Sequence, residues 1–231
     1  METAFITLTN TGYIDYTLNC LASLDRIKSD IDLHCYCIGK EGYEILTSNG
    51  HLCTLIDEEI NSNFQQYRSG NWSNIVHNKF CIIHENLQKF KYVCIIDGDI
   101  VLENKDFLPY LYASSDGYDI LIQNDTMLNE NNTNLCSGFM FIVSNASTIE
   151  LFDPKHVEQY KDTVGWGDQK YINEIKDKLI YKILPLELFP NGQYYYANAT
   201  TITPYIIHFN WVKGHEKKTK MQEYNRWYIG Q

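Results

Sequence analysis

The stretch of sequence that decides the fold is YVCIIDGDIVL, residues 92–102. It begins with a largely apolar run rich in β-branched side chains, which is typical of a strand buried on both faces of a sheet. Asp97 and Asp99 follow directly and are separated by Gly98. Because ligands of open α/β sheets bind at the carboxyl ends of the strands, this stretch predicts a buried strand that delivers two carboxylates to a binding site.

Segments on both sides of this stretch alternate between strand-like and helix-like patterns. The predicted strands are residues 4–9, 33–38, 51–56, 119–123 and 136–143. The predicted helices are residues 13–27, 42–48, 72–87, 147–152, 157–161 and 167–178. After residue 184 the pattern is irregular, until an apolar segment at 205–209 and a Lys-rich helix. The alternation predicts an α/β fold with a mostly parallel sheet flanked by helices, in a single domain of residues 1–231.

The amino-acid composition excludes several classes of protein. The 231 residues include 19 basic and 29 acidic ones, a formal net charge of −10, which argues against a nucleic-acid partner. The seven cysteines are an odd number, which favours reduced thiols in a cytosol-like compartment. The N-terminus has no signal-peptide pattern, and no stretch approaches the ~18 apolar residues of a membrane span. We therefore predict a soluble, cytoplasmic protein.

The carboxylate pair has three interpretations. Asp97 and Asp99 offer oxygen ligands to a hard divalent cation, which in turn neutralises a bound diphosphate. They also fit a solvated turn after a buried strand. Phosphatases of the haloacid dehalogenase class use the first Asp of such a pair as nucleophile, but they place it after their first strand. Here about three predicted strands come first, an order that fits metal-dependent nucleotide-sugar transferases.

Several ordered motifs together resemble the GT-A glycosyltransferases, and most closely the retaining families 8 and 77. The resemblance covers residues 5–227. Its motifs are TLTNTGY (7–13), Lys79, DGD (97–99), ND (124–125), LCSGFMFI (135–142), GWGDQKYIN (165–173) and IIHFNWVKG (206–214). It implies a Rossmann-like GT-A domain in which residues 1–100 bind the nucleotide and end in the DxD motif. Residues 101–231 then form the sugar and acceptor half, with a C-terminal metal and diphosphate segment.

The resemblance also assigns roles to individual residues. Asp97, Asp99 and His208 become metal ligands, and a mixed oxygen and nitrogen set suits Mn²⁺ better than Mg²⁺. The residues implied in donor binding are Thr9, Asn10, Tyr13, Lys79, Gly98, Ser137, Gly138, Gly214 and Lys218. Those implied on the sugar face, as catalytic candidates, are Asp125, Asp168 and Gln169. Asn10 and Tyr13 are expected to contact uracil.

Other interpretations stay open for some of these residues. His208 lies between apolar neighbours, so it is also consistent with a buried core histidine whose hydrogen bonds are satisfied. Asp168 is also consistent with an acidic residue at a helix N-terminus. For Lys217 and Lys220 we favour a solvated helix. Cys136 stands where the resembling families have Asn. The aromatic residues Tyr194–Tyr196, Phe189 and Trp166 form either an acceptor wall or loop packing.

The implied function is metal-dependent transfer of a sugar from a nucleotide diphosphate donor, a UDP-sugar, to a hydroxyl of a glycan or glycoprotein, with retention of configuration. The chain is also similar to compact glycosyltransferase domains of algal large DNA viruses, a setting that implies the host cytoplasm. Two alternatives remain at this point: a dehalogenase-type phosphatase that uses Asp97, and a non-catalytic nucleotide-sugar-binding or self-glycosylating protein.

Overall fold

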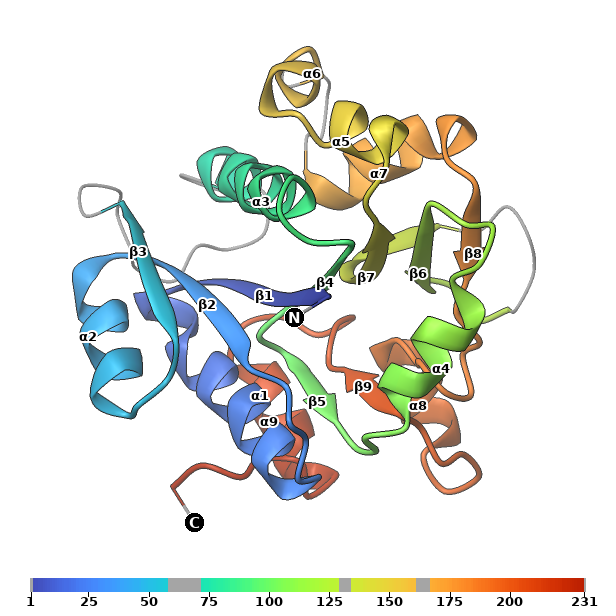
Figure 1. The fold of residues 1–231 in the computed structure, drawn as a ribbon. Coiled ribbons are helices and arrows are strands. Elements are labelled where there is room, and N and C mark those ends of the chain that lie inside the picture. The colour runs from blue at the N-terminus through green and yellow to red at the C-terminus, as the bar shows by residue number, and fades with distance from the viewer. Residues whose placement is uncertain (1, 58–71, 129–133, 161–166, 231) are drawn as a thin grey trace.

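The computed structural model describes residues 2–57, 72–128, 134–160 and 167–230 (Figure 1). Its strands are β1 Thr3–Asn10, β2 Leu33–Ile38, β3 Cys53–Asp57, β4 Tyr92–Ile96, β5 Ile100–Leu102, β6 Ile120–Asn124, β7 Leu135–Val143, β8 Tyr181–Ile183 and β9 Ile206–His208. Its α-helices are α1 Ile14–Arg26, α2 Lys40–Ser48, α3 Trp72–Leu87, α4 Phe107–Ser114, α5 Ala146–Leu151, α6 Pro154–Glu158, α7 Asp168–Ile175, α8 Gly192–Asn198 and α9 His215–Glu223. Short 3-10 helices cover Thr11–Tyr13 and Lys176–Lys178.

Seven strands form the central sheet, in the order β3-β2-β1-β4-β7-β6-β8. Strand β7 is antiparallel to β4 and β6, and the other neighbouring pairs are parallel. Strand β4 lies between β1 and β7, and Val93–Ile96 are fully buried, as the unbroken apolar run requires. The prediction of a mostly parallel sheet flanked by helices in one α/β domain is confirmed.

Helices cover both faces of the sheet (Figure 1). On one face, Phe80 of α3 and Tyr171 of α7 belong to one buried cluster, together with side chains of β1, β4 and β7. On the other face, Leu21 of α1, Leu46 of α2 and Phe107 of α4 belong to a second cluster. Because both faces are apolar and covered, polar side chains gather where the strands end.

A second sheet of two strands, β5 and β9, lies beside the central one (Figure 1). The strands are antiparallel, with Ile100 opposite His208. A third buried cluster, which includes Tyr16, Tyr195 and Met221, packs this small sheet against α1, α8 and α9. The C-terminal segment is thereby brought next to residues 97–99.

The predicted elements match with small shifts at their ends, but β5, β8, α4 and α8 were not predicted. Strands of three residues carry no readable period, and α8 contains Tyr194–Tyr196, which we expected to be irregular. Its N-cap Asn191 accepts a hydrogen bond from the backbone N–H of Tyr194 at 3.0 Å. Phe189 is fully buried, so it belongs to the core rather than to an acceptor wall. Trp166 and Lys161 lie outside the described residues.

Within the described part of the chain, no helix combines the length and the apolar character that crossing a bilayer needs.

Candidate active site

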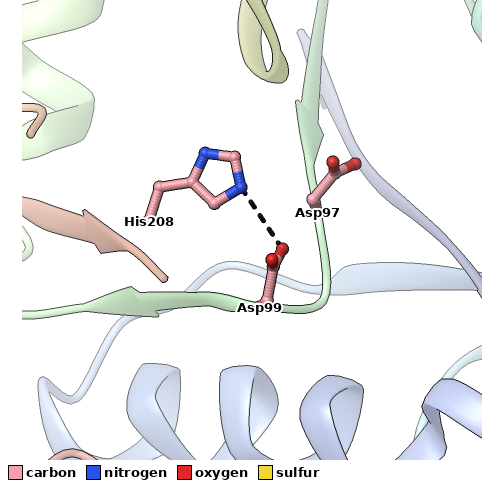
Figure 2. A group of neighbouring side chains, drawn as sticks. All are labelled: Asp97, Asp99 and His208. Carbon is pink, nitrogen blue, oxygen red and sulfur yellow. Dashed lines mark ion pairs between the residues drawn. The ribbon is translucent and has the colours of Figure 1, made fainter. Parts of the chain in front are cut away.

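Two carboxylates and one imidazole meet where β4 and β9 end. Asp97 follows β4, Asp99 precedes β5, and His208 is the last residue of β9. One ligand atom from each of the three lies within 4.8 Å of the other two, and His208 Nε2 is 3.4 Å from Asp99 Oδ1 (Figure 2). The pairing of β5 with β9 brings Asp99 and His208 together. The backbone N–H of Phe209 continues this pairing, because it donates to Asp99 O at 3.0 Å.

Two glycines leave room for these side chains. A Cβ at Gly138 would lie 2.3 Å from His208 Cε1, so the imidazole ring occupies the space that any larger residue would fill. A Cβ at Gly98 would lie 2.7 Å from Thr17 Oγ1. The glycines of the DGD and SG motifs are therefore explained by close packing around the cluster.

His208 is held on its far side by Gln123, a fully buried residue of β6. The Gln123 amide nitrogen donates to the carbonyls of Phe189 at 3.1 Å and Pro190 at 2.9 Å. Its oxygen therefore faces His208 Nδ1, at 2.8 Å, and accepts the Nδ1 proton. Burial disfavours the imidazolium, but the facing Asp99 carboxylate raises the pKa of His208 well above its usual value.

Lys79 of α3 is buried between two carboxylates. Its Nζ donates to Asp97 Oδ1 and to Asp168 Oδ2, both at 2.8 Å, and to the carbonyl of Ser137 at 3.0 Å. The Ser137 hydroxyl also donates to Asp168, at 2.8 Å. Burial raises the pKa of Asp168, but Lys79 and these hydrogen bonds outweigh it and leave that pKa below its usual value. Lys79 thus fixes one predicted metal ligand relative to one predicted sugar-face residue.

A second lysine, Lys217 of α9, pairs with the other carboxylate. Its Nζ contacts Asp99 Oδ2 and donates to the Tyr13 hydroxyl at 2.5 Å. Burial works against the charge of Asp99, but Lys217 and then His208 hold the pKa of Asp99 well below its usual value. Lys217 is therefore not the solvated residue that we expected.

Lys218, which we expected at the diphosphate, points elsewhere. Its Nζ lies 4.5 Å from the centre of the Trp227 ring, and it lines a separate pocket. The helical phase explains this correction: Lys217 is four residues from the buried Met221 and shares its inward face, whereas Lys218 is rotated away by about 100°. The structure thus brings Lys217, rather than Lys218, to the cluster.

The end of β1 forms a further part of the site. The Thr9 hydroxyl accepts from Thr17 at 2.7 Å, which fixes the strand against α1. Asn10 is buried, and among the described residues its Oδ1 has no hydrogen-bond partner. A buried acceptor that lines a pocket without a partner is the group expected at a ligand N–H.

Asp125 lies just beyond β6 and accepts hydrogen bonds at both carboxylate oxygens. Oδ1 accepts from Trp211 Nε1 at 2.8 Å and Asn210 Nδ2 at 2.9 Å. Oδ2 accepts from Gln169 Nε2 at 2.8 Å and Asn134 Nδ2 at 3.2 Å. This carboxylate therefore orients its neighbours, and Gln169 in particular.

The cluster borders a pocket of about 280 Å³. Among the predicted site residues that line it are Thr9, Asn10, Tyr13, Lys79, Asp97, Gly98, Asp99, Ser137, Gly138, Asp168, Gln169, His208 and Gly214. Asp125 stands behind Gln169, and Lys218 is turned away. Sequence reasoning missed Gln123 and assigned Lys217 to solvent. Two signals were readable: a polar residue at the end of an apolar strand, and a lysine four residues before an apolar Met.

Comparison with known proteins identifies the family of the chain. The family model described as nucleotide-diphospho-sugar transferase matches residues 40–222. A "UDP-galactose:fucoside alpha-3-galactosyltransferase" of Dictyostelium discoideum is 27% identical over 282 aligned positions, which cover 97% of this chain. The chain spans 43% of the length of that relative.

Solved structures share the fold. The galactosyltransferase LgtC, in complex with donor and acceptor sugar analogues, matches with a TM-score of 0.62 at 13% identity, over 90% of this chain and 86% of LgtC. A glycosyltransferase involved in glycosylation of the major capsid of PBCV-1 matches with a TM-score of 0.59 at 11% identity, over 96% of this chain and 98% of that one.

The family model and the shared fold define the class of protein as a glycosyltransferase of the GT-A type. Within that class, the chain belongs to the nucleotide-diphospho-sugar transferase family. The resemblance found in the sequence is confirmed, and neither the phosphatase nor the non-catalytic alternative is favoured.

Proposed function

We propose that this glycosyltransferase is metal-dependent, and that Asp97, Asp99 and His208 bind Mn²⁺ or Mg²⁺ together with the diphosphate of a UDP-sugar. The observation that carries the proposal is the convergence of these three ligand atoms within 4.8 Å at the pocket. The donor set fits such an ion, because two carboxylates and an imidazole are ligands that Mn²⁺ accepts. When bound, the ion would supply Lewis-acid stabilisation of the leaving diphosphate.

The chain's own cations support the same role. Lys217 carries an ammonium group beside Asp99, three residues beyond Gly214, where a diphosphate on the metal would meet it. A buried positive charge stabilises the charge that develops on the leaving group. Asn10 Oδ1 offers an acceptor for the N3–H of uracil, and Tyr13 borders the same pocket. An acidic protein would thus bind an anionic donor through a few buried cations.

In the proposed reaction, the bond between the anomeric carbon and the diphosphate oxygen breaks, and its electron pair leaves with the diphosphate. A new bond forms from the anomeric carbon to the acceptor oxygen, whose proton is released. Asp168 and Gln169 would face the sugar, where a carboxylate and an amide oxygen stabilise positive charge. Lys79 and Ser137 hold the Asp168 carboxylate in position.

The relative's name supports a more specific donor and outcome. It describes transfer from UDP-galactose to a fucoside with an α product, and because UDP-galactose carries an α-linked sugar, that product corresponds to retention. We infer a UDP-galactose donor, a glycan or glycoprotein acceptor that ends in a pyranoside, and retention for this chain as well. In this proposal residues 1–100 serve the nucleotide, and residues 101–231 serve the sugar and the acceptor.

Calorimetric titration of the full chain with UDP tests this proposal, in buffer containing MnCl₂, MgCl₂ or EDTA. We expect UDP binding with either metal and at least tenfold weaker binding in EDTA, about 1.4 kcal/mol. Hydrolysis of UDP-galactose is then compared with that of UDP-glucose and UDP-xylose. Equal affinity for UDP in EDTA would refute metal dependence.

Two further readouts address the alternatives. A self-glycosylating protein would gain the mass of a sugar on incubation with donor alone, which intact-mass spectrometry detects. A phosphatase would release phosphate from a phosphomonoester such as p-nitrophenyl phosphate without any nucleotide sugar. We expect neither result.

A further inference from the structure

We propose that Trp211 is the platform on which the sugar ring of the acceptor stacks, and that Asp125 is the positioning residue that holds its indole. This inference rests on the proposed function, because it adds the acceptor subsite to the donor site. It assigns an acceptor of defined chemistry: a pyranoside that presents an apolar C–H face.

The conformation of Trp211 is unusual for a residue of its size. The residue is 54% exposed, although a large aromatic side chain is usually buried. Its backbone has φ of +64°, in the left-handed region, which is unfavourable for a residue other than glycine. Such strain persists where the surroundings impose it, and it clusters at ligand-binding sites.

The surroundings of Trp211 show what imposes this conformation. The indole Nε1 donates to Asp125 Oδ1 at 2.8 Å, and the same oxygen accepts from Asn210 at 2.9 Å. The other oxygen of Asp125 is held by Gln169 and Asn134. The N–H edge of the indole is therefore fixed by a carboxylate that three other N–H donors hold in place, while much of the ring stays accessible. A rigid, exposed ring is what C–H faces of a pyranose pack against.

The location of Trp211 fits the acceptor rather than the nucleotide. Its chain neighbours Asn210 and Val212 line the donor pocket, and Asp125 links Trp211 directly to Gln169. Gln169 and Asp168 line that pocket at the end proposed for the donor sugar. Because the acceptor hydroxyl must reach the anomeric carbon, the acceptor ring has to bind beside that end. Trp211 directly follows the pocket residue Asn210 and hydrogen-bonds to Asp125, which places it next to that end of the pocket.

This arrangement also changes the role of Asp125. A carboxylate that accepts four N–H hydrogen bonds has little capacity left to take a proton from an acceptor hydroxyl. Asp125 therefore acts through Trp211 and Gln169, rather than as the catalytic group on the sugar face that the resemblance implies.

The test compares Trp211→Ala and Trp211→Phe with the wild type, and uses Leu52→Ala as the matched control. Leu52 is an equally exposed apolar residue (56%) just before β3, an edge strand of the central sheet. Saturation-transfer NMR and titration measure the affinity for p-nitrophenyl α-fucoside and methyl β-galactoside, with and without UDP and MnCl₂. We expect Trp211→Ala to weaken glycoside binding about tenfold or more. Trp211→Phe keeps a ring and should lose less, and Leu52→Ala should match the wild type.

The result that overturns the platform is a Trp211→Ala variant that binds either glycoside within twofold of the wild type. Failure of both glycosides to bind the wild type overturns it as well. Failure of the wild type to bind UDP refutes the donor proposal instead. In that case, titration with the glycosides in the absence of UDP still tests whether Trp211 binds the acceptor ring. For Asp125→Asn we expect a rise in the KM for the glycoside that exceeds any fall in the kcat of donor hydrolysis. The reverse pattern would restore Asp125 as a catalytic residue on the sugar face and overturn its role as a positioning residue.

Discussion

Gln123 Oε1 lies 2.8 Å from His208 Nδ1, and this contact decides which ring nitrogen faces Asp99. The Gln123 amide nitrogen is committed to two backbone carbonyls, so its oxygen can only accept the Nδ1 proton. Nε2 is then the nitrogen that faces Asp99, and a metal ion bound there would replace its proton. Partners of this kind on the far side of a ligating histidine contribute about 10–100-fold to metal affinity.

Replacing Gln123 with Met, which has a similar shape, should therefore weaken Mn²⁺ binding by about 10–100-fold. The substitution also leaves the Phe189 carbonyl without its Gln123 donor, while the Pro190 carbonyl keeps only the backbone N–H of His208, so unfolding in urea should occur at lower concentration. Calorimetry with MnCl₂ measures the first effect. The matched control is Asn86→Leu, which removes a buried amide that donates to Tyr36 Oη and Ile82 O away from the site. The control should lose stability but keep its Mn²⁺ affinity, and equal losses of affinity in both variants would contradict the role of Gln123.

The adjacent residues Lys217 and Lys218 of α9 can be tested separately. Loss of Lys217 should change the affinities for Mn²⁺ and for UDP in opposite directions. Lys217 occupies Asp99 Oδ2, so its ammonium competes with a divalent cation there, yet the same charge attracts a diphosphate. Lys217→Ala should therefore bind Mn²⁺ alone more tightly and bind UDP in the presence of Mn²⁺ about tenfold more weakly. Lys218→Ala should change neither affinity by more than about twofold, because Lys218 lies over Trp227. If Lys218→Ala weakens UDP binding more than Lys217→Ala does, the assignment from the sequence was right.

The contrast between these lysines shows what the sequence could predict. Asp97 and Asp99 follow a buried strand, and local rules alone bring them to the edge of the sheet. The contact between Gln123 and His208 joins residues 85 positions apart, and it depends on the pairing of β5 with β9, two strands of three residues each. A strand of three residues is too short to show an alternating hydrophobic pattern. Which face of α9 points toward the site is set by the packing of Met221.

The buried ammonium group of Lys79 should contribute mainly to the free energy of unfolding. Its Nζ lies 2.8 Å from both Asp97 Oδ1 and Asp168 Oδ2, and its side chain is 6% exposed. Lys79→Met leaves two carboxylates without their counter-ion, which should lower the free energy of unfolding by about 3–5 kcal/mol. Urea unfolding measures this loss. Lys91→Met removes an ion pair at the surface, with Glu2, and should change the midpoint little.

The pH dependence of that loss has a defined sign. Lys79 keeps the pKa of Asp168 below its usual value, so the pair stabilises the fold above the ordinary carboxyl range. This stabilisation disappears as the pH falls through the folded-state pKa of Asp168. The difference between the wild type and Lys79→Met should therefore be largest near neutral pH and shrink below about pH 4. A difference that grows on acidification would rule out the pairing as its cause.

Asp99→Asn tests the metal site itself, because it keeps the shape of the side chain and removes the charge. Asp99 faces His208 Nε2 at 3.4 Å and contacts Lys217, so the variant loses a metal ligand and the partner of that lysine. We expect UDP binding in MnCl₂ to weaken by about 100-fold or more and donor hydrolysis to fall with it, because the ion both binds the diphosphate and stabilises its departure. Circular dichroism should show the fold intact. Asp119 lies at the opposite end of β6 and accepts hydrogen bonds from Asn145 and Ile180 with its two oxygens. Asp119→Asn keeps only one of these oxygens but should hydrolyse donor as the wild type does. Unchanged turnover in Asp99→Asn would remove Asp99 from the site, and with it the metal on which the proposed mechanism depends.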